Sequence, residues 1–227
     1  MSSLIVITGT TKGLGKEIFD LLIDDEHNLI SISISFPDYQ LEAWKKKKNI
    51  QLKKCDLSDQ KAVARILDSI TIPKKCSKII FINNAGIIEP IGKISEADSM
   101  SIGRSINVNF SSPVLIVRRL LQLTKEKIGF KIINISTGAA LRPIQGWAMY
   151  CSTKAAFRMF LDSIALEKDL KIKVIQFDPG VMNTSMQEKI RSRNNRFSTQ
   201  SMFRKLKAEG KLKEPSDVAR KIVKELL

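Results

Sequence analysis

Short apolar runs rich in isoleucine and valine alternate with longer segments of mixed polarity along this chain. Each apolar run has the length and composition of a buried strand, and a turn or a helical pattern follows it. We predict strands at residues 4–8, 28–35, 50–55, 78–83, 130–136 and 172–177, and helices at residues 16–23, 37–47, 59–70, 98–127, 147–168 and 215–227. This alternation is typical of βαβ units and predicts an α/β fold with a doubly wound parallel sheet of the Rossmann type.

Residues 181–213 interrupt the alternation with a long polar and basic segment that contains scattered apolar residues. Insertions of this length in a compact domain often cover a binding site, so we predict that this segment is a substrate lid. The 227 residues suit a single domain, residues 1–227, because no linker, internal repeat or low-complexity segment divides them.

The formal net charge of +15 raises the question whether nucleic acid or an acidic membrane is a partner. One dense basic run, residues 45–48, falls where a helix is predicted to end, and cations are favoured there. Residues 189–213 mix lysine and arginine with Phe197 and Phe203, a combination that can bind phosphates. We favour solvated surface for both segments and therefore expect neither nucleic acid nor a membrane as a partner.

The three cysteines, Cys55, Cys76 and Cys151, are odd in number and far apart in the sequence. They predict neither a disulfide framework nor a metal site. The apolar run near the N-terminus is too short for a signal peptide, and no stretch approaches the ~18 apolar residues of a membrane-spanning helix. We therefore expect a soluble cytoplasmic protein that binds no metal.

A glycine-rich segment follows the first predicted strand, and we call this segment, Thr8-Gly9-Thr10-Thr11-Lys12-Gly13-Leu14-Gly15, the glycine loop. A strand that ends in spaced glycines and continues as a helix directs unpaired backbone N–H groups and a positive helix dipole at one point. The G-x-x-x-G-x-G spacing departs from the general G-x-G-x-x-G dinucleotide motif, and simple turn chemistry is the alternative interpretation. We interpret the loop as the binding site of a phosphorylated cofactor.

Polar motifs also follow later strands, namely Asn83-Asn84-Ala85-Gly86, Ser136-Thr137-Gly138 and Asp178-Pro179-Gly180. Because the carboxyl ends of parallel strands meet at one edge of a sheet, we expect these motifs to lie near the glycine loop. Tyr150 and Lys154 are four residues apart on a predicted helix and share one of its faces. The Lys154 ammonium should lower the pKa of Tyr150 and make it a usable proton donor, although an exposed pair is the alternative for these two residues alone.

These motifs, in this order and over nearly the whole chain, resemble the short-chain dehydrogenase/reductase family. The runs at residues 133–138, 146–151 and 178–187 resemble the branch that contains sepiapterin reductases and microbial benzil reductases. The resemblance implies hydride transfer between a nicotinamide cofactor and a carbonyl or alcohol. Members usually have a further strand after the last helix, whereas this chain ends within that predicted helix, so we expect six strands and no pterin specificity.

The resemblance implies four catalytic residues. Tyr150 would protonate the carbonyl oxygen, and Lys154 would lower the pKa of that tyrosine and bind the nicotinamide ribose. Thr137 stands thirteen residues before the tyrosine, where the family usually has a serine that holds the substrate oxygen. We favour Thr137 in this role and keep Ser136 as the alternative. Asn109, on the long middle helix, would support a water relay to the lysine.

The choice of cofactor follows from charge. The end of the second predicted strand, residues 33–36, lacks the carboxylate that commonly selects NAD, and Lys12 adds a cation near the expected 2′-phosphate. Both features favour NADP(H), with a solvent-facing lysine as the alternative for Lys12. The residues that the resemblance places at the cofactor are Gly9, Thr11, Lys12, Gly13, Leu14, Gly15, Ser35, Asp56, Leu57, Asn83, Ala85, Gly86, Tyr150, Lys154, Pro179, Gly180, Val181 and Thr184.

The substrate is expected among apolar side chains, Trp147, Met149, Met182 and Met186, with Phe203 nearby. They favour a bulky apolar or aromatic ketone, although ordinary core packing is an alternative for such residues. The basic lid would also suit an anionic substrate, so the polarity of the substrate stays open.

The leading functional prediction is the NADPH-dependent reduction of a small-molecule ketone or diketone, with a 3-ketoacyl thioester as an alternative substrate. A non-catalytic NADP-binding regulator on the same fold and a basic nucleic-acid-binding protein are the alternatives. Tyr150 and Lys154 argue against a regulator, which needs no proton donor, and the dispersed lysines argue against nucleic acid. We also expect a homodimer through the helices at residues 98–127 and 147–168.

Overall fold

The computed structural model describes residues 2–124, 128–167, 171–192 and 198–227. Its sheet has six strands in the order β3-β2-β1-β4-β5-β6, and every neighbouring pair is parallel. This confirms the predicted doubly wound sheet. The strands are β1 (Ser2–Thr8), β2 (Asn28–Ser33), β3 (Ile50–Lys54), β4 (Cys76–Asn83), β5 (Gly129–Ile135) and β6 (Ile172–Phe177).

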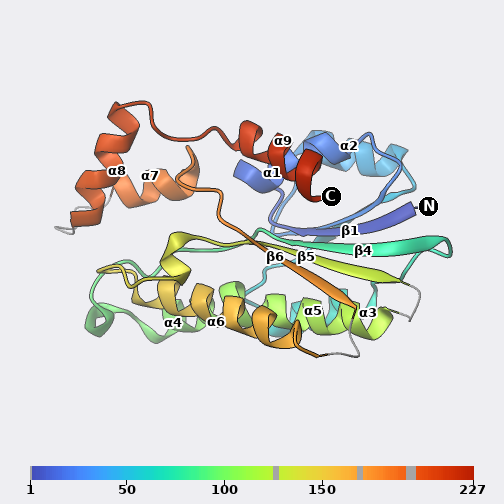
Figure 1. Cartoon of the computed structure of the whole chain (residues 1–227), viewed down its shortest axis with the longest axis horizontal. Coiled ribbons are helices and arrows are strands. Elements are labelled where there is room, and N and C mark those ends of the chain that lie inside the picture. The colour runs from blue at the N-terminus through green and yellow to red at the C-terminus, as the bar shows by residue number, and fades with distance from the viewer. Residues whose placement is uncertain (1, 125–127, 168–170, 193–197) are drawn as a thin grey trace.

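Helices cover both faces of the sheet (Figure 1). One layer contains α1 (Gly13–Leu22), α2 (Asp38–Lys46) and α9 (Pro215–Leu226), and the other contains α3 (Gln60–Asp68), α4 (Ser99–Ile106), α5 (Ser112–Leu123) and α6 (Ala148–Ile164). Short helical turns are η1 (Ile94–Glu96), η2 (Asn107–Ser111) and η3 (Gly138–Ala140).

Two apolar layers hold the helices to the sheet. Phe81 and Phe157 lie in the layer between the sheet and α5 and α6, while Phe19 and Ile222 lie in the layer beneath α1 and α9. All four side chains are fully buried, and burial of a side chain of this size stabilises the fold by about 1.5–3 kcal/mol. The strand sequences are apolar on both sides because both faces of this parallel sheet are covered.

The order of the strands positions the functional site. The connections leave β1 and β4 in opposite directions across the sheet, so a crevice forms where the carboxyl ends of these two neighbouring strands separate. The glycine loop follows β1, and the motif that begins at Asn83 follows β4. The fold therefore brings both sequence motifs to the same crevice.

The observed ends of several helices differ from the predicted ones. α1 begins at Gly13 rather than at residue 16, because the last glycines of the loop already form the first helical turn. The helix predicted at residues 98–127 consists of α4, a π-helical turn at η2, and α5. α6 ends at Ile164, short of the predicted residue 168, and residues 127 and 168 lie outside the described residues.

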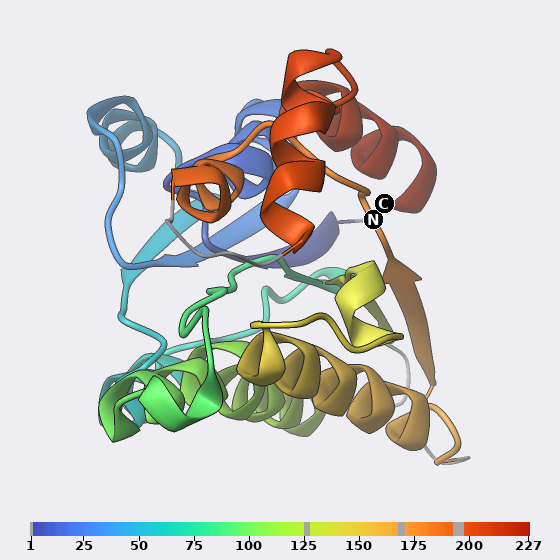
Figure 2. The same ribbon diagram turned by 90° about the vertical axis from the view of Figure 1, so that its left-hand side faces the viewer.

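The predicted lid segment contains two helices that its polar sequence did not indicate, α7 (Ser185–Ser192) and α8 (Ser198–Ala208). Both lie beyond the carboxyl ends of the strands (Figure 1), where α7 and α8 pack against each other, and Figure 2 shows α8 from its side. The two ends of the lid segment are joined to each other. The Lys213 N–H donates to the carbonyl of Val181, and the Asn183 N–H donates to the carbonyl of Lys213, both at 2.9 Å. Phe197 lies outside the described residues.

Candidate functional site

The glycine loop is held against the end of β4 by Asn84. The Asn84 Nδ2 donates to the carbonyl oxygens of Thr8 and Gly9, both at 2.9 Å. In return, the Thr8 hydroxyl accepts from the backbone N–H groups of Asn84 and Ala85 at 3.1 and 3.0 Å. These bonds fix the distance between the two walls of the crevice.

Two glycines of the loop have no room for a side chain. Gly9 has a φ of +75°, and a Cβ there would lie 3.1 Å from Ala85. A Cβ on Gly15 would lie 2.2 Å from the Gly9 carbonyl oxygen and 2.3 Å from the Asn84 Nδ2. Glycine at these positions is therefore required by the close packing of the loop.

The N-terminus of α1 is suited to an anion. Lys12, the residue before the first helical turn, has an extended backbone and provides no capping hydrogen bond, and the first turn has no acidic side chain. The first N–H groups of a helix have no partner within the helix, and its dipole is positive at this end. A phosphate at this helix end would satisfy these groups.

A cavity of about 600 Å³ extends from the glycine loop to Tyr150 and the lid. A Cβ on Gly13 would lie 3.6 Å from the Thr184 side chain, so the start of the lid segment borders the loop. The cavity brings together most of the predicted residues, namely Gly9, Thr11, Lys12, Gly13, Leu14, Ser35, Asp56, Leu57, Ala85, Gly86, Ser136, Thr137, Trp147, Tyr150, Lys154, Pro179, Gly180, Val181, Met182, Thr184, Met186 and Phe203.

Four predicted residues do not line this cavity: Gly15, Asn83, Asn109 and Met149. Gly15 packs against the loop backbone, as described above. Asn83 is buried in the sheet, where its Nδ2 donates to the Asn134 Oδ1 at 2.9 Å. Asn84, rather than Asn83, contacts the glycine loop, because successive residues at the end of a strand point to opposite sides.

Asn109 lies behind the cavity on the π-helical turn η2. Its Oδ1 accepts from the Ile87 N–H at 2.9 Å, and its Nδ2 donates to the Ile87 carbonyl at 2.8 Å and to the Thr153 hydroxyl at 3.1 Å. π-helical turns occur frequently at functional sites. Here the turn directs the Asn109 amide between the segment after β4 and α6, next to Lys154.

Lys154 is buried, and its Nζ donates to the carbonyl of Ile135 at 3.1 Å. Burial lowers the pKa of Lys154 to about 8. A Cβ on Gly86 would lie 3.4 Å from both the Lys154 Nζ and the Asn109 Oδ1. The glycine therefore leaves the ammonium open to the cavity.

Tyr150 is also buried, and its pKa corrects one prediction. Burial raises the pKa of Tyr150 to about 12, a hydrogen bond with the Thr137 side chain acts to lower it, and the charge of Asp178 raises it further. We expected Lys154 to bring this pKa down, but the loss of solvation around the phenolate outweighs the favourable contacts. Tyr150 is therefore a protonated phenol at neutral pH.

Thr137 and Ser136 differ in their surroundings. The Thr137 side chain contacts Tyr150 and also accepts from the Ala139 N–H at 3.3 Å. The Ser136 hydroxyl is buried and, among the described residues, has no hydrogen-bond partner. The Thr137 hydroxyl is thus the one that stands beside the phenol.

The lid packs directly on this part of the cavity. Phe203 of α8 stacks on Trp147, with ring centroids 5.6 Å apart and an angle of 3° between the planes. Trp147 meets Tyr150 edge to face at 5.9 Å. The Lys189 Nζ of α7 lies 2.7 Å from the Glu89 Oε1 on the segment after β4. Phe203 and Ile190 of the lid thus belong to the same buried apolar cluster as Trp147 and Tyr150.

Several cavity residues were missed by the sequence interpretation: Ile88, Glu89, Arg104, Val108, Gln187, Lys189 and Ile190. Arg104 lies on α4 and pairs with Asp56 at 3.5 Å. Glu89 lies only three residues beyond the motif that ends at Gly86.

A family model described as short chain dehydrogenase matches residues 3–195. The chain is 35% identical over 228 residues to a benzil reductase ((S)-benzoin forming) of Bacillus cereus, covering 96% of this chain and 91% of that protein. It is 26% identical over 236 residues to the sepiapterin reductase of Rattus norvegicus, with coverages of 97% and 90%. The solved structure of ElxO with NADP bound has a TM-score of 0.74 and 25% identity, covering 98% of this chain and 90% of that one.

In the described part of the chain, no helix is both long and apolar enough to cross a membrane. Within the same residues, histidine, cysteine, aspartate and glutamate form no group of three or more that could hold a metal ion.

Proposed function

Because the chain belongs to the short-chain dehydrogenase family, in the branch with benzil and sepiapterin reductases, we propose that it reduces ketones or diketones with NADPH. The observation that carries this proposal is a single cavity that joins the glycine loop to Tyr150, Thr137 and Lys154. A proton donor beside a dinucleotide-sized site is what carbonyl reduction requires.

The residues present fit a nicotinamide dinucleotide. The glycine loop and the N-terminus of α1 form a cradle for the pyrophosphate, and the ends of β2 and β3 form a wall for the adenosine half of the molecule. When bound, the nicotinamide supplies the hydride that reduces the carbonyl carbon. The Lys154 ammonium, facing the space above Gly86, would bind the nicotinamide ribose, and Thr184 would bind the carboxamide.

In this proposal, side chains of the protein donate the proton and stabilise the charge that remains. Tyr150 donates its phenolic proton to the carbonyl oxygen of the substrate, and Thr137 holds that oxygen with a hydrogen bond. Lys154 stabilises the phenolate that remains, and Asn109 orients the segment around the lysine. The lid excludes water from the phenol through the Trp147 and Phe203 stack.

The preference for NADPH is supported by charge. The end of β2 contributes Ser33 and Ser35 to the cavity, with Ile34 between them, and no carboxylate that would repel a 2′-phosphate. Lys12 lines the same cavity and is exposed on the glycine loop, next to Thr11, whose hydroxyl donates to the Ser35 carbonyl at 2.7 Å. ElxO, whose solved structure holds NADP, provides independent support from a protein of similar fold.

The substrate that the lid favours is an aromatic ketone or diketone. Trp147, Met182, Met186 and Phe203 form an apolar wall, and the similar Bacillus cereus protein is a benzil reductase. Among the described residues of the lid, Lys189 lines the cavity, and it is paired with Glu89, which argues against an anionic substrate.

The proposal is tested by the oxidation of NADPH, followed by absorbance, with aromatic diketones, a 3-ketoacyl thioester and a pterin as substrates. We expect the diketones to give the highest kcat/KM, and NADH to give a lower value than NADPH with the same diketone. If no carbonyl compound supports turnover with either cofactor, the proposed reaction is wrong. Faster turnover with NADH would contradict the proposed cofactor alone.

We predict that the kcat for reduction is constant below about pH 8 and decreases above it. Burial lowers the pKa of Lys154 to about 8, so the ammonium loses its proton as the pH rises through this value. Tyr150, with a pKa raised to about 12, stays protonated over the same range. A pH profile of kcat measures this, and in Lys154→Met the remaining activity should lack the decrease. A kcat that rises between pH 7 and 9 would contradict the assignment.

We also propose that the protein forms a homodimer through α4, α5 and α6. Met100 of α4 and Met159 of α6 are 85% and 66% exposed, which is unusual for large apolar side chains on adjacent helices. Sedimentation at micromolar concentration should give the mass of a dimer, and Met159→Lys should shift it to that of a monomer. A monomeric wild-type protein would disprove the dimer.

A further inference from the structure

The helix α2 is attached to the rest of the protein by a polar side chain. Of its nine residues, all of them described, Gln40 alone is buried, and its side chain is fully inaccessible to solvent. Burial of an amide without partners is costly, so such a residue must have its hydrogen bonds satisfied. The hydrogen-bond partners of Gln40 therefore show which part of the protein α2 is attached to.

Gln40 binds the glycine loop at Thr10. Its Nε2 donates to the Thr10 carbonyl at 3.0 Å and to the Tyr39 hydroxyl at 3.1 Å, so both amide protons have acceptors. Its Oε1 lies 3.5 Å from the Thr10 hydroxyl. None of these contacts involves the cavity itself, because Gln40 does not line it.

The other polar groups of Thr10 bind β2. The Thr10 N–H donates to the Ser33 hydroxyl at 2.7 Å, and its own hydroxyl lies 2.6 Å from the Ser31 hydroxyl. The next residue, Thr11, donates to the Ser35 carbonyl at 2.7 Å. Thr10 thus connects the loop to the end of β2, which lines the cavity. Gln40 binds the same Thr10 from the side that faces away from the cavity.

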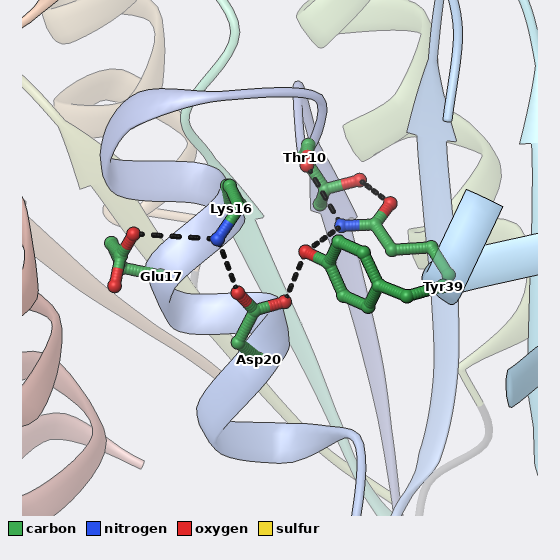
Figure 3. A network of polar contacts seen from close by, with 6 residues as sticks. Thr10, Lys16, Glu17, Asp20 and Tyr39 are labelled. Atoms are coloured by element: carbon green, nitrogen blue, oxygen red, sulfur yellow. Dashed lines mark hydrogen bonds and ion pairs between the residues drawn. The ribbon is translucent and has the colours of Figure 1, made fainter. Parts of the chain in front are cut away.

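The network continues from Gln40 to α1 (Figure 3). The Tyr39 hydroxyl donates to the Asp20 Oδ1 at 2.5 Å, and the Lys16 Nζ donates to the Asp20 Oδ2 at 2.7 Å. Burial and the Asp20 carboxylate raise the pKa of Tyr39, so its hydroxyl keeps the proton that it donates. A chain of hydrogen bonds that ends on an ion pair strengthens each of its members.

Besides the serines of β2 and Ser35, two amide side chains hold the loop at different residues. Asn84 holds Gly9 and the glycines that approach a pyrophosphate, whereas Gln40 holds Thr10, which precedes Thr11 and Lys12. Because Thr10 and Thr11 are hydrogen-bonded to Ser33 and Ser35, the position of Thr10 sets how the next loop residue, Lys12, lies relative to the end of β2. The 2′-phosphate of the cofactor proposed above would lie beside Lys12 and the end of β2.

We propose that Gln40 is a positioning residue that sets the preference of this protein for a dinucleotide with a 2′-phosphate. It does so without touching the cofactor, by fixing Thr10 and hence the wall that carries Lys12. The inference rests on the proposed NADPH preference, and it assigns that preference to the Gln40 anchor as well as to the charges on the surface of the site.

The test measures equilibrium dissociation constants of NADP⁺ and NAD⁺ by titration calorimetry, in the absence of any carbonyl substrate. We expect Gln40→Met to raise the Kd for NADP⁺ about tenfold, because a wall held by hydrogen bonds loses its position. The Kd for NAD⁺ should change by less than about twofold, since the Asn84 anchor is intact. The deciding quantity is therefore the ratio of the Kd for NAD⁺ to the Kd for NADP⁺, which Gln40→Met should lower.

Leu41→Ala is the matched control, because Leu41 packs in the same helix against the core and has no contact with Thr10 among the hydrogen bonds described. It should loosen α2 and leave the ratio unchanged. If Leu41→Ala lowers the ratio as much as Gln40→Met does, general loosening explains the effect and the inference is overturned. An unchanged ratio in Gln40→Met overturns it as well.

Should Gln40→Met fail to fold, Tyr39→Phe carries the same expectation, because it removes one acceptor of the Gln40 amide. A decrease of the ratio by about twofold supports the anchor, and no decrease overturns it. A wild-type protein that binds both dinucleotides equally contradicts the proposed cofactor, and the role of Gln40 falls with it. A wild-type preference for NADP⁺ that survives in the variants contradicts the role of Gln40 alone.

Discussion

Replacement of Tyr150 by phenylalanine should reduce the kcat for carbonyl reduction by about 10²- to 10⁴-fold, since this removes the proton donor of the proposed reaction. The phenol is buried beside Thr137, so no solvent molecule can easily take its place. The ring itself contributes the edge-to-face contact with Trp147, which phenylalanine keeps. Steady-state turnover of an aromatic diketone with saturating NADPH measures the effect.

The same variant should retain its affinity for NADPH and its thermal unfolding midpoint, which separates a loss of chemistry from a loss of structure. Thr137→Val should also reduce kcat, whereas Thr137→Ser keeps the hydroxyl and should stay close to the wild type. Turnover by Tyr150→Phe within tenfold of the wild-type rate would show that another group supplies the proton.

Replacement of Gly15 by alanine should destabilise the protein by about 3 kcal/mol and abolish detectable binding of NADPH. The new Cβ would lie 2.2 Å from the Gly9 carbonyl oxygen and 2.3 Å from the Asn84 Nδ2. Both atoms belong to the contact that holds the loop to β4, so the loop must move to accommodate the methyl group. Chemical denaturation and cofactor titration measure the two effects.

Gly103→Ala is the matched control for this substitution. Gly103 lies in α4, and a Cβ there would meet nothing within 4 Å. Alanine has a higher helix propensity than glycine, so this variant should be as stable as the wild type or more stable by about 0.5–1 kcal/mol. If Gly15→Ala behaves like Gly103→Ala, the loop is not packed as described.

The sequence predicted the sheet and the place of the site because both depend on local patterns. Each apolar strand is short, and each functional motif directly follows a strand, so the topology of a parallel sheet was enough to bring them together. The same reasoning could not distinguish Asn83 from Asn84. A shift of one residue at a strand end decides which amide reaches Thr8, and this register is set by pairing with β5.

Other features depended on burial, which no local pattern records. The pKa of Tyr150 is raised because the phenol is buried in a cluster with Trp147 and the lid residues Ile190 and Phe203, and α7 and α8, which carry these two, were not predicted as helices. Gln40 shows the same limit. Its neighbours in α2 are polar or partly exposed, so the sequence gives no sign that this amide is the buried residue of its helix.

The joined ends of the lid segment have a consequence for how this enzyme family can diversify. Val181, Asn183 and Lys213 fix the two ends of the lid to each other. The lid is therefore a closed loop whose two ends stay at the same distance from each other. Changes of length inside such a loop cost little free energy of closure, since this cost grows slowly with length. A lid of another length can therefore be joined to the same two ends. The part of the protein that binds the carbonyl substrate can then change while the part that binds the dinucleotide stays the same.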